Sequence, residues 1–85
     1  MNQKKNSPNY FFMRGECKYL IKDFSSAIND MTKAIELKQD FDKAYFFRGI
    51  SEMEINKKED GCKDLNKAKE LNYSKADEFI KKYCN

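Results

Sequence analysis

The segment KAIEL at residues 33–37 returns as KAKEL at residues 67–71, 34 positions later. When residues 8–41 are set beside residues 42–75 without a gap, further identities appear on the N-terminal side of this segment. The identical positions are Phe12/Phe46, Arg14/Arg48, Gly15/Gly49, Ile21/Ile55, Asp30/Asp64, Lys33/Lys67, Ala34/Ala68, Glu36/Glu70 and Leu37/Leu71. A constant period of this length indicates a stacked repeat architecture.

The first period has the pattern of two helices. Ser7 is suited to cap the first of them, and Pro8 then occupies a first helical position. Asp23 is suited to cap the second helix, whose apolar residues up to Leu37 share one face. The polar residues of that helix are expected to face water: Asn29, Asp30, Lys33 and Glu36.

The second period repeats this pattern and is followed by a further helix. It opens at Asp42, and Asn56 tolerates the left-handed conformation that ends a helix. Ser74 and Asp77 fit a capping box at the start of a fifth helix. Because no stretch alternates apolar and polar residues in the manner of a strand, the sequence predicts an all-α protein of five helices.

These periods resemble the tetratricopeptide repeat (TPR) family over residues 8–84. The resemblance rests on aromatic, glycine, small and large apolar residues at the family's signature places. They are Phe11/Tyr45, Gly15/Gly49, Ala27/Gly61, Met31/Leu65 and Ala34/Ala68. The glycine usual between the two helices of a repeat is Lys22 in the first period and Asn56 in the second.

The resemblance implies antiparallel helix pairs stacked as a short right-handed solenoid. Residues 8–41 and 42–75 are then two repeats, residues 74–84 a C-terminal capping helix, and residues 1–7 a flexible N-terminal tail. Capping helices of this kind cover the apolar face of the last repeat.

The resemblance also implies where a ligand lies, because the first helix of each repeat lines an inner concave groove in this family. The groove candidates are Asn9, Phe12, Glu16, Tyr19 and Leu20 from the first repeat, and Lys43, Phe46, Ile50, Met53 and Glu54 from the second. Of the clamp that holds a terminal carboxylate in chaperone-binding members, only Lys43 is retained. The groove is therefore expected to be aromatic and aliphatic, with no such clamp.

The predicted function is to bind a partner peptide or helix in this apolar groove. The alternative is a structural role, in which the chain is a self-assembling terminal fragment of a larger array and forms a homo-oligomer. Aromatic residues at these places also serve helix packing alone, and self-association or the N-terminal tail could cover the groove.

Composition excludes several other functions. The 17 Lys and Arg residues and the 14 Asp and Glu residues alternate along the chain, so no basic stripe for nucleic acid is predicted. No catalytic or cofactor-binding motif is present, so neither an enzyme nor a cofactor is expected. The N-terminus is polar and no apolar run reaches membrane length, which makes a cytoplasmic location the simplest.

Three cysteines and two arginines each allow two interpretations. With no histidine and wide spacings, Cys17, Cys62 and Cys84 do not predict a metal site, and are expected to be buried and reduced. A disulfide between Cys62 and Cys84 is the alternative.

Arg14 and Arg48 are expected to pair with acids such as Asp30 and Asp64. The alternative is that the two arginines form a pair of anion contacts along the stack.

Overall fold

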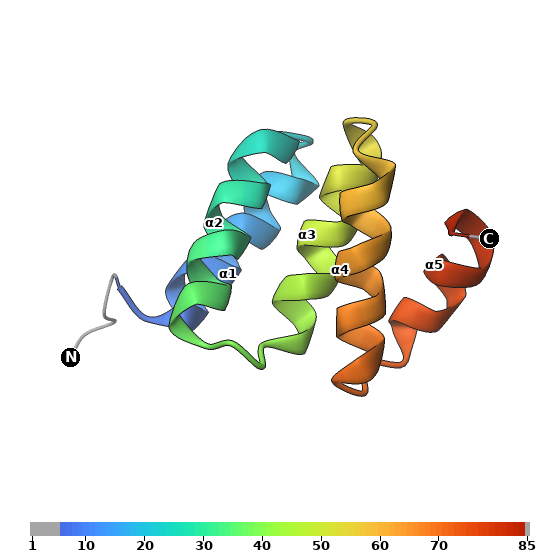
Figure 1. The fold of residues 1–85 in the computed structure, drawn as a ribbon. Coiled ribbons are helices and arrows are strands. Elements are labelled where there is room, and N and C mark those ends of the chain that lie inside the picture. The colour runs from blue at the N-terminus through green and yellow to red at the C-terminus, as the bar shows by residue number, and fades with distance from the viewer. Residues whose placement is uncertain (1–5, 85) are drawn as a thin grey trace.

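A computed structural model describes residues 6–84 and consists of helices joined by short turns (Figure 1). The helices are α1 (Pro8–Leu20), α2 (Phe24–Leu37), α3 (Asp42–Glu54), α4 (Lys58–Glu70) and α5 (Lys75–Tyr83). The described residues contain no strand, so the prediction of an all-α protein of five helices is confirmed. Residues 1–5 of the expected N-terminal tail lie outside the described residues.

The first two helices begin where the sequence predicts. The Ser7 hydroxyl accepts a hydrogen bond from the Tyr10 amide at 3.1 Å, and Pro8 follows as the first helical residue. The Asp23 carboxylate accepts from the Ser26 amide at 3.4 Å. Both caps satisfy amide groups that have no partner inside the helix.

The turns inside the repeats use left-handed residues. Lys22 and Asn56, which stand where the family favours glycine, both have φ of 67°. Asn72, after α4, has φ of 75°. Asn adopts this conformation more readily than Lys, so the turn after α1 carries the greater strain.

The start of α5 differs from the prediction. The Ser74 side chain makes no capping hydrogen bond, and the expected capping box with Asp77 is absent. The Asp77 carboxylate instead pairs with Lys69 of α4 at 2.9 Å and with Lys81 at 3.3 Å, and these hydrogen bonds lower its pKa. An interaction between two helices has displaced a local one.

Glycine allows close packing within each helix pair. A methyl group on Gly49 would lie 3.0 Å from the carbonyl oxygen of Gly61, and one on Gly61 would lie 2.8 Å from that of Gly49. In the first pair, a methyl group on Gly15 would lie 2.9 Å from the Met31 methyl and 3.4 Å from the Ala27 carbonyl. The glycine and small-residue places of the resemblance therefore meet in both repeats.

Each repeat also holds an arginine–aspartate pair between its helices. Arg14 donates two hydrogen bonds to Asp30, at 2.8 and 3.0 Å, and Arg48 does the same to Asp64, at 2.8 and 2.9 Å. The expected pairing is confirmed. The expectation that Asp30 faces water is wrong, since it is 6% exposed because Arg14 holds it against α1.

The expectation that Leu37 faces the core is also wrong. Leu37 ends α2 and is 47% exposed, because it lies past the buried stretch of that helix.

Arg48 also makes a contact between the repeats, donating a hydrogen bond to the hydroxyl of Thr32 in the first repeat at 3.2 Å. Repeat 2 is thereby tied to repeat 1 by a polar contact as well as by its apolar core.

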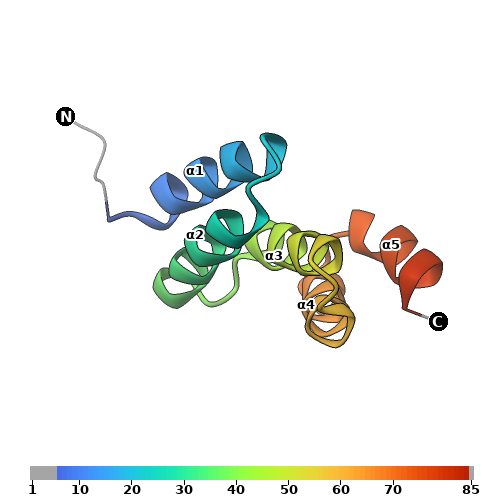
Figure 2. The same ribbon diagram turned by 90° about the horizontal axis from the view of Figure 1, so that it is seen from above.

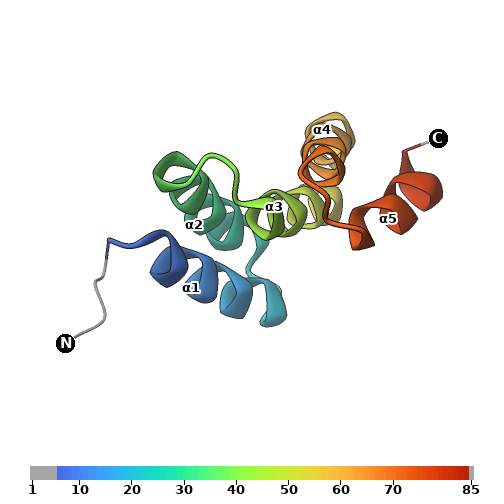
Figure 3. The same cartoon turned by 90° about the horizontal axis from the view of Figure 1, so that it is seen from below.

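The helices are stacked with α3 at the centre of the molecule. α1 and α2 lie on one side of it, and α4 and α5 on the other (Figures 2 and 3). α1, α3 and α5 run in the same direction, so their C-terminal ends lie together at the upper side of Figure 1. One core cluster includes Met31 and Ala44, and a second includes Leu65 and Ala76.

Cys62 of α4 and Cys84 at the end of α5 form a disulfide, with Cα atoms 5.8 Å apart. The expectation of three buried, reduced cysteines is therefore wrong, because the turn after α4 brings the end of α5 back onto α4. Cys17 is free, but it is exposed. Disulfides persist mainly in oxidising compartments, so this bond does not favour the cytoplasm. The cytoplasmic location stays a prediction from the sequence.

Candidate functional site

The predicted groove residues fall into three classes of exposure. Four are exposed: Asn9 and Lys43 near the N-terminal ends of α1 and α3, and Leu20 and Glu54 at the C-terminal ends of the same helices. Four are half-buried: Phe12, Glu16, Tyr19 and Met53. The remaining two are buried, Phe46 at 5% exposed and Ile50 at 7%.

Phe46 and Ile50 are buried because α5 supplies a third helix beside α3. Both belong to the core cluster that includes Ala76, and Phe79 and Ile80 pack against that cluster. The ring centroids of Phe46 and Phe79 are 5.1 Å apart. The middle of the predicted groove is thus covered by the C-terminal helix.

A hollow remains open between the C-terminal halves of α1, α3 and α5, and we call it the C-terminal hollow. Its volume is about 340 Å³. Its lining residues are Tyr19, Ile50, Met53, Glu54, Asn56, Phe79 and Tyr83. It brings together four of the groove candidates, Tyr19, Ile50, Met53 and Glu54. The candidates that do not line it are Asn9, Phe12, Glu16, Leu20, Lys43 and Phe46.

A second concavity adjoins the first, and we call it the adjoining hollow. Its volume is about 250 Å³, and its lining residues are Tyr19, Leu20, Lys22, Phe24 and Glu54. Tyr19 and Glu54 line both hollows, so the two concavities lie next to each other at the end of α1. Together they form a groove that crosses the ends of α1, α3 and α5.

Aromatic rings run along this groove from the start of α2 to the end of α5. Successive ring centroids are 5.1 to 6.0 Å apart, close enough for edge-to-face or tilted contacts. The row consists of Phe24, Tyr19, Phe47, Phe46, Phe79 and Tyr83. Such a row gives the groove a rigid apolar floor.

Sequence reasoning missed Phe79 and Tyr83 as groove residues. Both lie on the apolar stripe of α5, where packing is the usual role. Their spacing of four residues places them on one face of α5, which is the available signal, but it does not show that part of this face stays open. Tyr83 is 43% exposed.

Lys22 lines the adjoining hollow only, whereas Glu54 is the charged residue that both hollows share. Its carboxylate makes no hydrogen bond or ion pair with any residue in the described range 6–84. The pKa of the Tyr19 hydroxyl is raised by burial, then by the charges of Glu54 and Tyr83. The phenol of Tyr19 thus stays protonated and can donate or accept a hydrogen bond.

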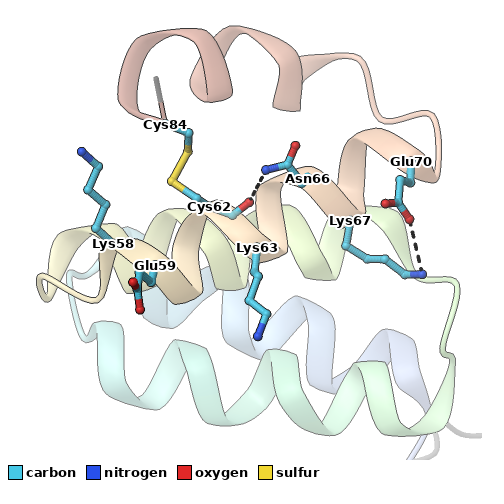
Figure 4. Close-up of a pocket in the computed structure, with 8 residues that line it drawn as sticks. All are labelled: Lys58, Glu59, Cys62, Lys63, Asn66, Lys67, Glu70 and Cys84. Atoms are coloured by element: carbon cyan, nitrogen blue, oxygen red, sulfur yellow. Dashed lines mark hydrogen bonds and ion pairs between the residues drawn. A yellow bond between two sulfur atoms is a disulfide. The ribbon is translucent and has the colours of Figure 1, made fainter.

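A larger hollow of about 550 Å³ lies on the outer face of α4 beside the disulfide (Figure 4). It is lined mainly by charged side chains of α4, including Lys58, Lys63 and Lys67. Cys62 and Lys69 of α4 occupy the repeat places that Ile28 and Ile35 hold on α2. The outer face of α4 is therefore more polar than the corresponding face of α2.

No three His, Cys, Asp or Glu side chains in residues 6–84 gather as a metal site. Across the same residues, none of the helices is both long and apolar enough to span a bilayer.

The comparisons with known proteins concern the fold. No family model matches the sequence, and no curated protein matches it. The structure is similar to the crystal structure of MamA, a TPR-like protein, with a TM-score of 0.81 and 17% sequence identity. The match covers 86% of this chain and 44% of MamA, so the chain spans less than half the length of that protein. At this identity the similarity establishes a TPR-like helical-repeat fold and nothing further.

Proposed function

We propose that the chain is a protein-interaction module that holds a segment of a partner polypeptide in the groove across α1, α3 and α5. The observation that carries this proposal is the pair of neighbouring hollows, of about 340 and 250 Å³, on the side of the stack formed by these helices. Their dimensions suit a few side chains of a peptide rather than a whole domain.

The rim of the groove supports the same function. Leu20 at one end is 70% exposed, and Tyr83 at the other end is 43% exposed. Large apolar side chains that flank a concave, aromatic-lined surface are typical of a place where another chain binds. Tyr and Met residues in the groove supply contact area for a peptide.

A peptide display experiment tests the proposal. Peptides selected on the wild-type chain are expected to lose at least tenfold in affinity for the variant Leu20→Arg/Tyr83→Arg, which places a charge at each end of the groove. The matched control is Ile21→Arg/Leu37→Arg, because these two side chains are 71% and 47% exposed and line neither hollow.

Circular dichroism establishes that both variants are as helical as the wild type. Peptides that bind both variants equally well would place the interaction outside the groove and contradict the proposal. A selection that enriches no peptide would contradict it too.

Self-association remains the second candidate, favoured by the outer surface of α1. Met13 is 58% exposed there, Ile21 is 71% exposed, and Cys17 between them is exposed too. Light scattering that gives the mass of a dimer or larger complex, reduced to the monomer by Met13→Glu/Ile21→Glu, would support this candidate.

A further inference from the structure

We infer that the C-terminal hollow receives a basic side chain of the partner, arginine in preference to lysine, with its cation beside Glu54. This inference rests on the proposed function, and it specifies the chemistry of the segment that binds. It was not expected from composition, because the chain as a whole carries a net charge of +3.

The lining of the C-terminal hollow has a single charged residue. Glu54 supplies that charge, and the other lining residues are aromatic, aliphatic or amide. Because the Glu54 carboxylate has no partner in residues 6–84, it is available to a cation from outside. Glu54 is itself exposed, and a charge-assisted hydrogen bond to its carboxylate is stronger than one between neutral groups.

The ends of three helices add to this negative charge. Tyr19, Glu54 and Tyr83 lie in the last turns of α1, α3 and α5, which run in the same direction and end on the same side (Figure 1). Each helix C-terminus carries about half a negative elementary charge from its aligned peptide dipoles. The hollow lies on the side of the stack where these three helices end. Lysines stand in the last turns of α1 and α5, so α3, whose last turn holds no basic residue, contributes this charge most directly.

The other lining residues suit the rest of an arginine side chain. Its methylene stem would lie against Met53, Ile50 and Phe79, which are apolar. Its planar guanidinium group stacks on aromatic rings and is more weakly hydrated than the ammonium group of lysine. Tyr19 and Tyr83 supply rings from the two outer helices of the groove.

The nearest lysines do not occupy this position. Lys22 lines the adjoining hollow and not the C-terminal one. Lys82 has its ammonium nitrogen 5.5 Å from the centroid of the Tyr83 ring, but it is not among the lining residues. A cation from the partner therefore meets no lysine in the lining of the hollow.

The test uses three capped peptides, acetyl-Ala-Leu-Xaa-Leu-Ala-amide, in which Xaa is arginine, lysine or citrulline. Citrulline has the shape of arginine without its charge. Binding to the ¹⁵N-labelled chain is followed by the amide signals of Tyr19, Glu54, Asn56 and Tyr83. The arginine peptide is expected to bind about fivefold to tenfold more tightly than the citrulline peptide, with lysine in between.

Two variants make the test specific. Glu54→Gln is expected to remove the preference for arginine over citrulline, whereas Glu59→Gln, which changes an exposed acid on α4, is expected to leave it unchanged. Equal binding of arginine and citrulline peptides at the groove signals would overturn the inference and leave the proposed function standing. An arginine preference that persists in Glu54→Gln would also overturn it. If no peptide shifts the groove signals at 10 mM, the inference is overturned.

Discussion

Glu52 of α3 is an acid whose side chain is only 10% exposed. Its nearest basic atom is Nε of Arg48 at 3.9 Å, and that group already donates to Asp64 at 2.8 Å. One Glu52 oxygen is buried without a hydrogen-bond partner in the described part of the chain. Lys18 occupies the equivalent place in the first repeat, so the buried acid is peculiar to the second.

These surroundings keep Glu52 protonated in the folded chain. Burial, followed by a hydrogen bond to Asp64 and the charge of that residue, raises the pKa of Glu52 from 4.5 to about 8. Because the folded state then holds a proton that the unfolded state releases, this contribution to stability is complete below pH 4.5. It is lost as the pH rises towards 8.

We therefore expect Glu52→Gln to stabilise the chain at pH 8 and to have little effect at pH 4.5. An amide fills the same space without a charge to bury, and the gain at pH 8 is expected to be about 1 to 3 kcal/mol. Urea unfolding of both proteins at the two pH values measures it. Since the other titrating groups are shared, they cancel in the difference. A variant that is equally stable to the wild type at both pH values would refute the assignment of the proton to Glu52.

At the scale of the element, the helix pairs depend on glycine where two backbones cross. The two crossings differ in what surrounds them. Gly61 faces the backbone oxygen of Gly49, which cannot move without its helix, whereas Gly15 faces the end of the Met31 side chain. A methionine end adapts at low cost.

Gly61→Ala is therefore expected to destabilise the chain by about 1 to 2 kcal/mol, although alanine favours the helix. Gly15→Ala is the matched comparison, and its cost is expected to be smaller because the Met31 methyl can move aside. Chemical unfolding at constant pH gives both values. If the two variants lose equal stability, the backbone contact between α3 and α4 does not limit their approach.

Most element boundaries could be predicted from the sequence because they depend on neighbouring residues. The caps at Ser7 and Asp23 and the left-handed Asn56 are confirmed, since each acts within one turn of its helix. The capping box at Ser74 failed because Lys69, on another helix, pairs with Asp77. No pattern local to α5 contains that information.

At the scale of the whole molecule, α5 completes the fold. It covers Phe46 and Ile50, and it supplies one wall of the C-terminal hollow through Phe79 and Tyr83. Its far end is fastened to α4 by the disulfide of Cys84. The integrity of the groove therefore depends on the attachment of α5.

Reduction of the Cys62–Cys84 disulfide is expected to lower the free energy of unfolding by about 3 kcal/mol. The crosslink joins residues 22 positions apart and lowers the conformational entropy of the unfolded chain, and reduction removes this effect. Urea unfolding with and without a thiol reductant measures the change. The double variant Cys62→Ser/Cys84→Ser is the control, and reductant is expected to have no effect on it. Equal stability of the oxidised and reduced chains would contradict this expectation.

The groove could be predicted only in part because it is built from three helices. Tyr19, Ile50 and Met53 follow from the repeat pattern, which assigns the first helix of each repeat to the concave side. Phe79 and Tyr83 come from a helix with no complete repeat of its own, so the pattern does not place them. Their role depends on how α5 is set against α3.

Glu54, the single charged residue in the lining of the C-terminal hollow, gives this chain of net charge +3 a local negative site. A basic partner segment is repelled by the surface lysines while it is distant and attracted by the hollow once it is close. At physiological ionic strength the Debye length is about 8 Å, much shorter than the 45 Å long axis of the molecule. Mobile ions therefore screen the repulsion during diffusional approach, while the attraction at contact persists, and such a segment can associate rapidly with a surface of its own sign.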